Sequence, residues 1–392
     1  MQRIPTFLLL LFAVLHAGCA TLAETPQAVP QPLAAQQPQA AAPPATTEVL
    51  PPTPASDAKP AALTPALPPA APHVALLLPL KSAAFARAAT AVQQGFMAAA
   101  GGTGLDVKVY PTDDQTAGIL SAYQEALQQG ARLVVGPLTR NAVTALAASS
   151  LVGVPTLALN QPDAEGALPQ NLYLFSLSVE AEARQIARSA FADGRLSALV
   201  VGTGTLLSKR TGQAFLDEWS SLRGQSAGQI DLPKSPDDYP ALRETIASHP
   251  SDMIFLAADA DRARLARPYL SAAVATYATS QIYGGKTDQP KNIDLTGIRF
   301  VDMPWLLQPD HPAVMAYPRA DFPSADLLRL YAFGIDAFRL AKSLVEGKVA
   351  AGFTLDGVTG SISVKDRQVF ERALTPAQFV QGEAVILELA AP

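Results

Sequence analysis

Four polar residues stand at or just beyond the ends of short apolar runs: Thr139, Asn141, Asn160 and Ser176. Such runs are typical of buried parallel strands, and the carboxyl ends of parallel strands form the edge at which open α/β sheets hold ligands. The loop before a helix that starts near Thr139 would also present backbone N–H groups to a carboxylate. The sequence therefore predicts a candidate cleft at these four residues. Helix capping and turn formation explain the same residue types, so that interpretation stays open.

Residues with catalytic chemistry do not gather in the sequence. The histidines show no His-x-x-x-His metal pair; they are His16, His73, His249 and His311. Asp113 and Asp114 are adjacent, so on a strand they would point to opposite faces, and a helix start explains them better. Gly202-Thr203-Gly204 follows an apolar run, but the third glycine of a dinucleotide loop would fall at Leu207. We therefore expect no enzyme, no metal and no cofactor.

Composition limits the remaining classes. The 392 residues are 49% hydrophobic, enough for one large or two medium cores. The formal net charge is −5 and the basic residues are dispersed, so the sequence lacks the basic patch of a nucleic-acid-binding protein. The single cysteine, Cys19, excludes a disulfide or a thiolate metal site within one chain.

The first 18 residues have the pattern of an export signal. A basic start is followed by the apolar run Phe7–Leu15, which is too short to span a bilayer comfortably, and then by Ala-Gly-Cys. This resembles the lipobox of bacterial lipoproteins, which predicts removal of residues 1–18 and acylation of Cys19. The alternative is an ordinary secretory signal cut nearby, since His16 is unusual in a lipobox. Ala20 after the cysteine indicates the outer membrane by the general sorting rule.

Residues 20–72 predict a disordered linker. They hold more than a third of the chain's 34 prolines, mixed with Ala, Gln and Thr and few large apolar residues. Such a segment cannot bury enough surface to offset its ordering entropy. In a polyproline conformation it would reach at most roughly 160 Å. We interpret it as a passive spacer, with a sequence-specific docking segment as the alternative.

From residue 73 the pattern is βαβαβαβ, which predicts a doubly wound parallel sheet with right-handed crossovers. Strands are expected at Val74–Leu80, Leu105–Tyr110, Arg132–Gly136, Val154–Leu159 and Asn171–Ser178. Helices are expected from the N-cap Ser82 to the glycines at 101 and 102, at Thr116–Gln129 and at Thr139–Ser150.

A second series repeats the pattern of the first. Its strands are expected at Ser197–Gly202, Ile230–Leu232, Asp252–Ala257, Ser280–Gly284 and Ile298–Met303. Its helices are expected at Glu180–Gly194, Leu206–Arg223, Tyr239–Ser248 and Asp261–Ala275, and one long helix follows at Ser324–Glu346. Two such series suggest two lobes with a cleft between them.

Several motifs resemble a known family. The run from LLLPL to VVGPLTRNAV and VPTLALNQ is similar to type I periplasmic-binding proteins. SQIYGGK, GIRFVDMPWLL, LYAFGIDAFRLA and FTLDGVTGSISVKD resemble more closely the penicillin-binding protein activators, the LpoA or LppC lipoproteins. The resemblance runs from about residue 73 to the end. Longer family members carry an amino-terminal helical-repeat domain, in whose place this chain has the proline-rich linker.

The resemblance implies a bilobed α/β fold with three hinge crossings, which we place near Ser178, Leu307 and Gly352. Lobe 1 would then contain residues 73–178 with 308–352, and lobe 2 residues 179–307 with 353–392. In solute-binding relatives the ligand lies between the lobes and closes them.

The same resemblance implies a non-catalytic lipoprotein, anchored in the outer membrane and facing the periplasm. Its implied partner is a class A penicillin-binding protein, whose peptidoglycan synthesis it would stimulate. The alternative is a solute-binding receptor for an amino acid or small peptide, serving an ABC transporter or sensor. Solute-binding loops usually offer small hydroxyl residues where this chain has Arg140 and Asn141, so the sequence does not indicate a small-molecule ligand. The apolar group at residues 300–306 predicts core packing, or else a surface for a partner.

Overall fold

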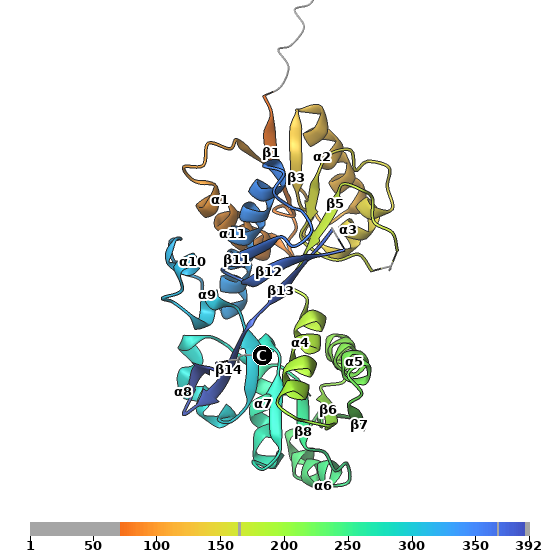
Figure 1. Cartoon of the computed structure of the whole chain (residues 1–392), viewed down its shortest axis with the longest axis vertical. Helices are drawn as coiled ribbons and strands as arrows, with labels where there is room; N and C mark the ends of the chain where they lie inside the picture. Colours follow the sequence, from red (N-terminus) through yellow and green to blue (C-terminus); the bar gives the residue numbers. More distant parts are fainter. Residues whose placement is uncertain (1–70, 164–165, 367, 389–392) are drawn as a thin grey trace, which may run out of the picture. The chain divides into compact units, whose positions relative to one another are not determined.

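Two sheets of mainly parallel strands organise the chain in the computed structural model, which describes residues 71–163, 166–366 and 368–388 (Figure 1). The predicted signal peptide, the lipidation site Cys19 and all but the last two residues of the predicted linker lie outside the described residues. Among the residues described, no helix is both long and apolar enough to cross a membrane. The prediction of an α/β fold with two doubly wound parallel sheets is confirmed.

The first sheet has the order β11-β12-β13-β5-β4-β3-β1-β2. Its five amino-terminal strands are parallel; they are β1 (His73–Leu78), β2 (Val107–Pro111), β3 (Ala131–Val135), β4 (Thr156–Ala158) and β5 (Leu172–Phe175). Leu76 and Leu77 show why the run is continuously apolar, because they face separate hydrophobic cores on the two sides of the sheet.

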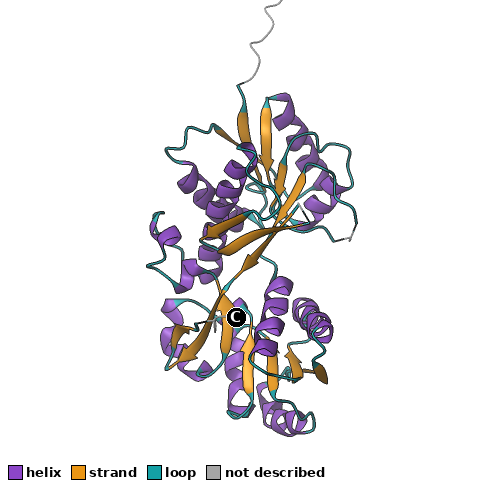
Figure 2. Ribbon diagram, in the orientation of Figure 1, coloured by secondary structure: helices purple, strands orange, loops and turns teal. Residues whose placement is uncertain are grey.

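Helices cover both faces of this sheet (Figure 2). They are α1 (Ala86–Ala100), α2 (Thr116–Gln128), α3 (Arg140–Ala147) and the long α11 (Ala325–Val345). Ser82 is not the N-cap of α1, which begins four residues later; its hydroxyl instead donates to Asp114 at 3.1 Å. Helices α1 and α11 pack with their backbones in contact, because Gly95 faces the Tyr331 carbonyl and Gly334 faces that of Val92.

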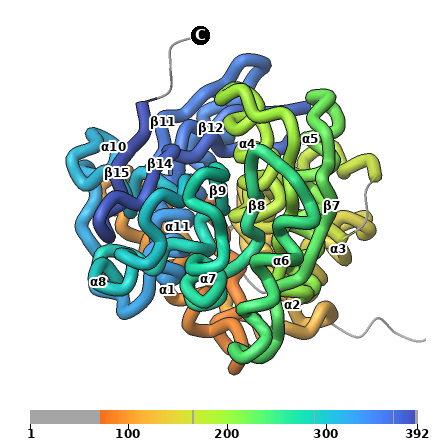
Figure 3. Tube along the Cα trace, turned by 90° about the horizontal axis from the view of Figure 1, so that it is seen from below, coloured from red at the N-terminus to blue at the C-terminus, as the bar shows by residue number. Residues whose placement is uncertain are grey.

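The second sheet has the order β15-β14-β10-β9-β8-β6-β7. Its parallel strands are β6 (Ser197–Gly202), β7 (Gln225–Asp231), β8 (Met253–Ala257), β9 (Ala275–Ala278) and β10 (Arg299–Asp302). The covering helices are α4 (Val179–Ala192), α5 (Leu206–Ser221), α6 (Leu242–Ala247) and α7 (Ala260–Ala266). In Figure 3, α4 and α7 lie on opposite sides of β8 and β9.

Two predictions for this half are wrong. The helix expected at Asp261–Ala275 ends at Ala266, because Pro268 cannot continue it, and the residues after the next turn form β9. The strand expected at Ser280–Gly284 is instead a 3₁₀ turn, η3 (Ser280–Ile282). Short helices follow at α8 (Gln289–Asn292), α9 (Pro304–Leu307) and α10 (Pro312–Met315).

The third predicted crossing, near Gly352, is also wrong. The strands β11 (Thr354–Gly357), β12 (Gly360–Lys365) and β13 (Val369–Ala373) extend the first sheet, because β13 pairs in parallel with β5. Its Phe370 is buried and packs edge-on to Phe175. The chain passes to the second sheet at Leu374, and the remaining strands there are β14 (Thr375–Val380) and β15 (Glu383–Ile386). Residues 354–373 therefore belong with lobe 1 rather than lobe 2.

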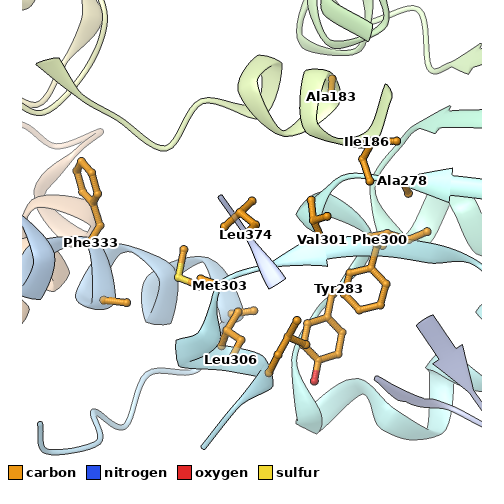
Figure 4. Packing of buried hydrophobic residues seen from close by; sticks show 14 of the residues in the cluster. Ala183, Ile186, Ala278, Tyr283, Phe300, Val301, Met303, Leu306, Phe333 and Leu374 are labelled. Atoms are coloured by element: carbon orange, nitrogen blue, oxygen red, sulfur yellow. The ribbon is translucent and has the colours of Figure 1, made fainter. Parts of the chain in front are cut away.

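A continuous apolar core joins the two sheets (Figure 4). Phe333 of α11 lies at one side, Met303 and Leu374 occupy the crossings, and Phe300 belongs to the second sheet. Trp305 is only 1% exposed, and Phe300 and Met303 are similarly buried. The core-packing interpretation of residues 300–306 is therefore confirmed.

Candidate functional site

The four predicted cleft residues lie at the carboxyl edge of the first sheet. Thr139 precedes α3, Asn141 lies in its first turn, Asn160 follows β4 and Ser176 follows β5. The loops carrying the first three lie together, since the Thr144 hydroxyl of α3 accepts a 2.9 Å hydrogen bond from the Asp163 amide. The sequence thus placed these residues on neighbouring segments of one edge.

Most of the polar groups at this edge are used within the protein. The Asn160 amide donates to the Leu138 carbonyl and accepts from the Gln161 amide, both at 2.9 Å, as in a turn. The carbonyl of Ser176 accepts from the Arg372 guanidinium at 3.2 Å. Thr139 occupies the N-cap position of α3 without a side-chain capping bond, and its buried hydroxyl has no partner among the described residues. These contacts are typical of turns rather than of a preformed ligand-binding site.

A small cavity lies at the matching edge of the second sheet. It has a volume of about 70 Å³ and is lined by Thr203, Thr205, Asp259 and Gln281 among others. Ligand pockets usually measure about 300 to 1,000 Å³, so this cavity is too small for an amino acid and its contacts. Ser208 fills part of the edge, because its hydroxyl donates to the Ala257 carbonyl and accepts from the Thr203 amide.

Arg329 of α11 reaches from the first lobe to the edge of the second sheet. Its Nε and Nη2 donate to the two carboxylate oxygens of Asp302 at 3.1 and 2.6 Å, which is a bidentate pair. Nη2 also donates to the carbonyls of Ser280 and Tyr283 at 3.0 and 2.7 Å. Both charged side chains are buried. The guanidinium therefore stands at the carboxyl ends of β9 and β10, the kind of edge at which open α/β sheets bind ligands.

Glu182 of α4 and Arg372 of β13 complete this set of charges. Glu182 accepts from the Ser280 amide at 3.0 Å, and its other oxygen lies 3.8 Å from the Arg372 guanidinium. Arg372 in turn donates to the Thr359 carbonyl of lobe 1 at 3.3 Å. We call Glu182, Asp302, Arg329 and Arg372 the hinge cluster. It has two acidic and two basic side chains, drawn from both lobes.

Burial and the neighbouring charges together shift the pKa values of residues in and beside the hinge cluster. It raises the pKa of Glu182, against the opposing effects of Arg372 and of the hydrogen bond from Ser280. It lowers the pKa of Arg372, which Glu182 partly restores. Burial also acts to lower the pKa of Arg329, but Asp302 outweighs it and the net shift is upward. Burial and the nearby Asp302 carboxylate raise the pKa of Tyr283 to about 12.

A fifth buried charge, Asp336, holds α11 to the first sheet. Its carboxylate accepts from the amides of Val358 and Thr359 at 3.2 and 2.8 Å and from the Thr359 hydroxyl at 2.7 Å. Burial raises the pKa of the Asp336 carboxyl, and Arg339, which forms an ion pair with it at 3.0 Å, opposes that shift. Through this carboxylate the turn between β11 and β12 is fixed to the same helix that carries Arg329.

The arrangement couples the two lobes mechanically. Breaking a buried ion pair by removing one partner typically costs about 3 to 5 kcal/mol, so separating the lobes at Arg329 would be strongly unfavourable.

The described histidines are dispersed: His73 bonds Tyr110, His249 bonds a backbone carbonyl and His311 lies 3.5 Å from Asp356. Among the described residues no group of three or more His, Cys, Asp or Glu is placed to hold a metal ion.

Sequence reasoning missed the hinge cluster, although a signal was present. Asp302 and Arg329 each interrupt an apolar run, in RFVDMPW and LLRLYAF. Charged residues are almost never fully buried unless they are paired, so a charge inside a core pattern indicates a partner elsewhere. Periodicity does not identify that partner, because the pairing depends on which lobe each element joins.

Comparison with known proteins places the chain in a family. The family described as "LppC putative lipoprotein" matches residues 27–241 and 239–382. Penicillin-binding protein activator LpoA of Yersinia pseudotuberculosis is 30% identical over 334 residues, which cover 73% of this chain and 50% of that protein. The chain thus spans about half the length of the curated relatives it matches. These relatives are named as activators rather than as enzymes.

Two solved structures are similar over most of the described residues. The C-domain of LpoA (YraM) from Haemophilus influenzae, described as a regulator of PBP1A, is 27% identical with a TM-score of 0.70, covering 81% of this chain and all of that one. A "putative branched-chain amino acid ABC transporter" of Chromobacterium violaceum is 37% identical with a TM-score of 0.67, covering 78% of this chain and 99% of that one. Both support the periplasmic-binding-protein-like fold, and the family match shows that this chain belongs to the LppC lipoprotein family.

Proposed function

We propose that this protein binds a class A penicillin-binding protein and stimulates its peptidoglycan synthesis. The observation that carries the proposal is the match to the LpoA C-domain, a described regulator of PBP1A, which is covered completely at a TM-score of 0.70. The family match and the named activators at about 30% identity support it further. In this proposal the folded region acts by contact with the synthase and performs no catalysis itself.

The geometry of the hinge supports a contact role. Arg329 and Arg372 connect α11 and β13 of the first lobe to the second sheet through buried charges. A body held in this way presents a fixed surface to a partner, which lowers the ordering cost of association. The edge cavity of about 70 Å³ offers little room for the small ligands that close solute-binding proteins.

Position in the cell follows from the sequence outside the described residues. We propose that residues 1–18 are removed, that Cys19 carries the lipid, and that residues 20–72 form a flexible linker from the outer membrane into the periplasm. Membership of a lipoprotein family supports this assignment.

The decisive experiment measures binding and stimulation together. Purified protein should retain a class A synthase of the same organism in a pull-down and raise its cross-linking of lipid-linked substrate in solution. The same pull-down and assay with an unrelated periplasmic protein in place of this one is the control. Absence of binding to every class A synthase of the organism would contradict the proposal.

A second function, solute reception, is favoured by one observation. The Chromobacterium violaceum chain described as a branched-chain amino acid ABC transporter is 37% identical over nearly its whole length. Calorimetry with leucine, isoleucine and valine distinguishes the two functions. A regulator should give no heat of binding, whereas a receptor should bind in the micromolar range, about −8 kcal/mol, and lose affinity in Thr139→Ala and Asn160→Ala.

A further inference from the structure

A cavity outside the predicted cleft and the hinge cluster lies between α9, the loop after η3 and the start of α11. Its volume is about 340 Å³, within the range of ligand pockets. Lys286 contributes from the loop, Trp305 and Leu306 from α9, and Arg319, Phe322 and Leu328 from the segment that leads into α11. We call it the α9 cavity. Lys286 and Arg319 are exposed, so the cavity is open to solvent on the side of its cations.

The α9 cavity carries two positive side chains that have no ion-pair partner in the described part of the chain. Neither Lys286 nor Arg319 forms an ion pair with a described residue, whereas nearby Arg264, Lys291 and Arg329 each pair with an aspartate. Arg319 is held in place, with its Nη1 donating to the Trp305 carbonyl at 2.7 Å and its guanidinium stacked 4.5 Å from the Trp305 ring. Its remaining donors make no hydrogen bond to the described residues.

The backbone of the α9 cavity is also suited to an anion. It includes Ser324 and Ala325, where the 21-residue helix α11 begins and its dipole is positive. The one acidic residue of that first turn, Asp326, is already paired with Arg329 at 2.8 Å. Gly285 of the loop has φ +91°, a conformation that favours glycine, and both Gly285 and the following Lys286 line the cavity.

The remaining wall is apolar. Leu306, Phe322 and Leu328 line it without polar atoms in their side chains, and Trp305 is packed behind Arg319. A free inorganic anion would leave this surface without a contact. A carboxylate attached to an apolar group would satisfy both parts of the cavity, since the cations take the charge and the apolar wall is removed from water.

We propose that the α9 cavity binds a short acidic segment of a partner protein, with a Glu or Asp carboxylate between Lys286 and Arg319 and an adjacent large apolar side chain against Leu306, Phe322 and Leu328. Charge complementarity selects this occupant, because neither cation has a carboxylate partner among the residues that the structure describes. The proposal goes beyond the proposed function, since it specifies a site and its chemistry whether or not the partner is a synthase.

An array of acetylated, amidated pentapeptides tests the proposal on the full chain purified in detergent. Each peptide has a central Glu flanked by every combination of large apolar residues, and each has a Gln twin. The Glu members should bind about tenfold or more tightly than their twins, as expected for a charge-assisted hydrogen bond. Binding that does not distinguish Glu from Gln, or no binding across the array, would overturn the proposal.

Variants assign the binding to this cavity. Arg319→Gln and Lys286→Gln should each remove about tenfold in affinity for the Glu peptides while leaving the weak Gln binding unchanged. Phe322→Ala should weaken both peptide classes equally. Lys209→Gln, which removes the same charge from an exposed site on α5, is the control. Lys286 makes no hydrogen bond to Trp305 among the described residues, unlike Arg319. The Lys286→Gln variant therefore still tests the proposal if Arg319→Gln unfolds. Unchanged Glu selectivity in the folded Lys286→Gln variant would rule the cavity out.

Discussion

Arg329 and Asp302 meet in a buried bidentate pair, at 3.1 and 2.6 Å, although they belong to different lobes. Arg329 lies on α11, which packs on the first sheet, and Asp302 ends β10 of the second. Both side chains are withdrawn from water, so the pair contributes to stability only while its geometry is intact. This buried ion pair therefore connects the two lobes at the hinge.

Removing one partner of this pair should be costly. Asp302→Asn leaves the Arg329 charge without its buried counter-ion, and the free energy of unfolding should fall by about 3 to 5 kcal/mol in urea titrations. Asp326→Asn is the control, because it removes an exposed partner of the same arginine and should cost about 1 kcal/mol or less. Equal losses in the two variants would show that burial does not set the strength of the pair.

Stability should also respond to pH through Glu182. Its pKa is raised above the ordinary 4.5, chiefly by burial, so the folded state keeps this proton at pH values where the unfolded state has lost it. The contribution of Glu182 to stability therefore falls as pH rises from about 4.5 through the raised pKa, and is constant above it.

Glu182→Gln keeps an acceptor for the Ser280 amide but does not titrate. Its stability relative to the parent should therefore improve between pH 4.5 and pH 7, as measured by urea unfolding at several pH values. Glu125→Gln on the exposed surface of α2 provides the control. A difference between Glu182→Gln and the parent that does not change with pH would refute the assignment.

The sequence predicts the fold best where a strand is buried along its whole length. Strands such as β1 and β6 are covered on both faces, so they appear as unbroken apolar runs. The edge strand β7 is longer than predicted. The apolar pattern did not reveal its first half, because Gln225, Gly228 and Gln229 give it a polar composition. For β11 to β13, periodicity does not say which sheet a strand joins. That information lies in the pairing of Val369 with Leu174.

The site was less accessible for a related reason. The sequence located the edge residues Thr139 and Asn160 correctly, because a loop position follows from the end of a strand. It did not show that Asn160 is bonded to Leu138, or that Arg329 occupies the facing edge of the other sheet. Those facts depend on contacts between segments that are distant in the chain.

The contact between α1 and α11 should not tolerate a side chain. A methyl group at Gly95 would overlap the Tyr331 carbonyl, so Gly95→Ala should destabilise the protein by about 1 to 3 kcal/mol or more, since the two helices must separate. Gly101→Ala is the control, since its φ of −53° suits alanine and its nearest neighbour lies 3.7 Å away. A Gly95→Ala variant as stable as the parent in a thermal melt would contradict this packing.

The proposed lipid anchor gives a prediction for the amino terminus. Cys19→Ser should release the protein from the outer membrane without lowering the melting temperature of the folded region, because Cys19 precedes the first strand by 54 residues. Membrane fractionation and a thermal melt check the two parts. A variant that remains with the outer membrane would exclude acylation at Cys19, while Ala20→Ser should stay anchored.

The linker should matter in cells but not in solution. If residues 20–72 only provide reach, shortening them should leave the stimulation of a purified class A synthase unchanged. In cells the same deletion should impair function in proportion to the lost length, because in the proposed arrangement the lipid holds one end at the outer membrane while the synthase is held in the inner one.

Replacement separates reach from specific contact. A Pro- and Ala-rich sequence of equal length but unrelated order should restore growth and cell shape to a strain with the shortened linker, since its extension per residue is similar. Failure of the replacement, with stimulation in solution intact, would show that residues 20–72 make contacts of their own. Loss of stimulation in solution on shortening would argue the same more directly, because no membrane distance has to be spanned there.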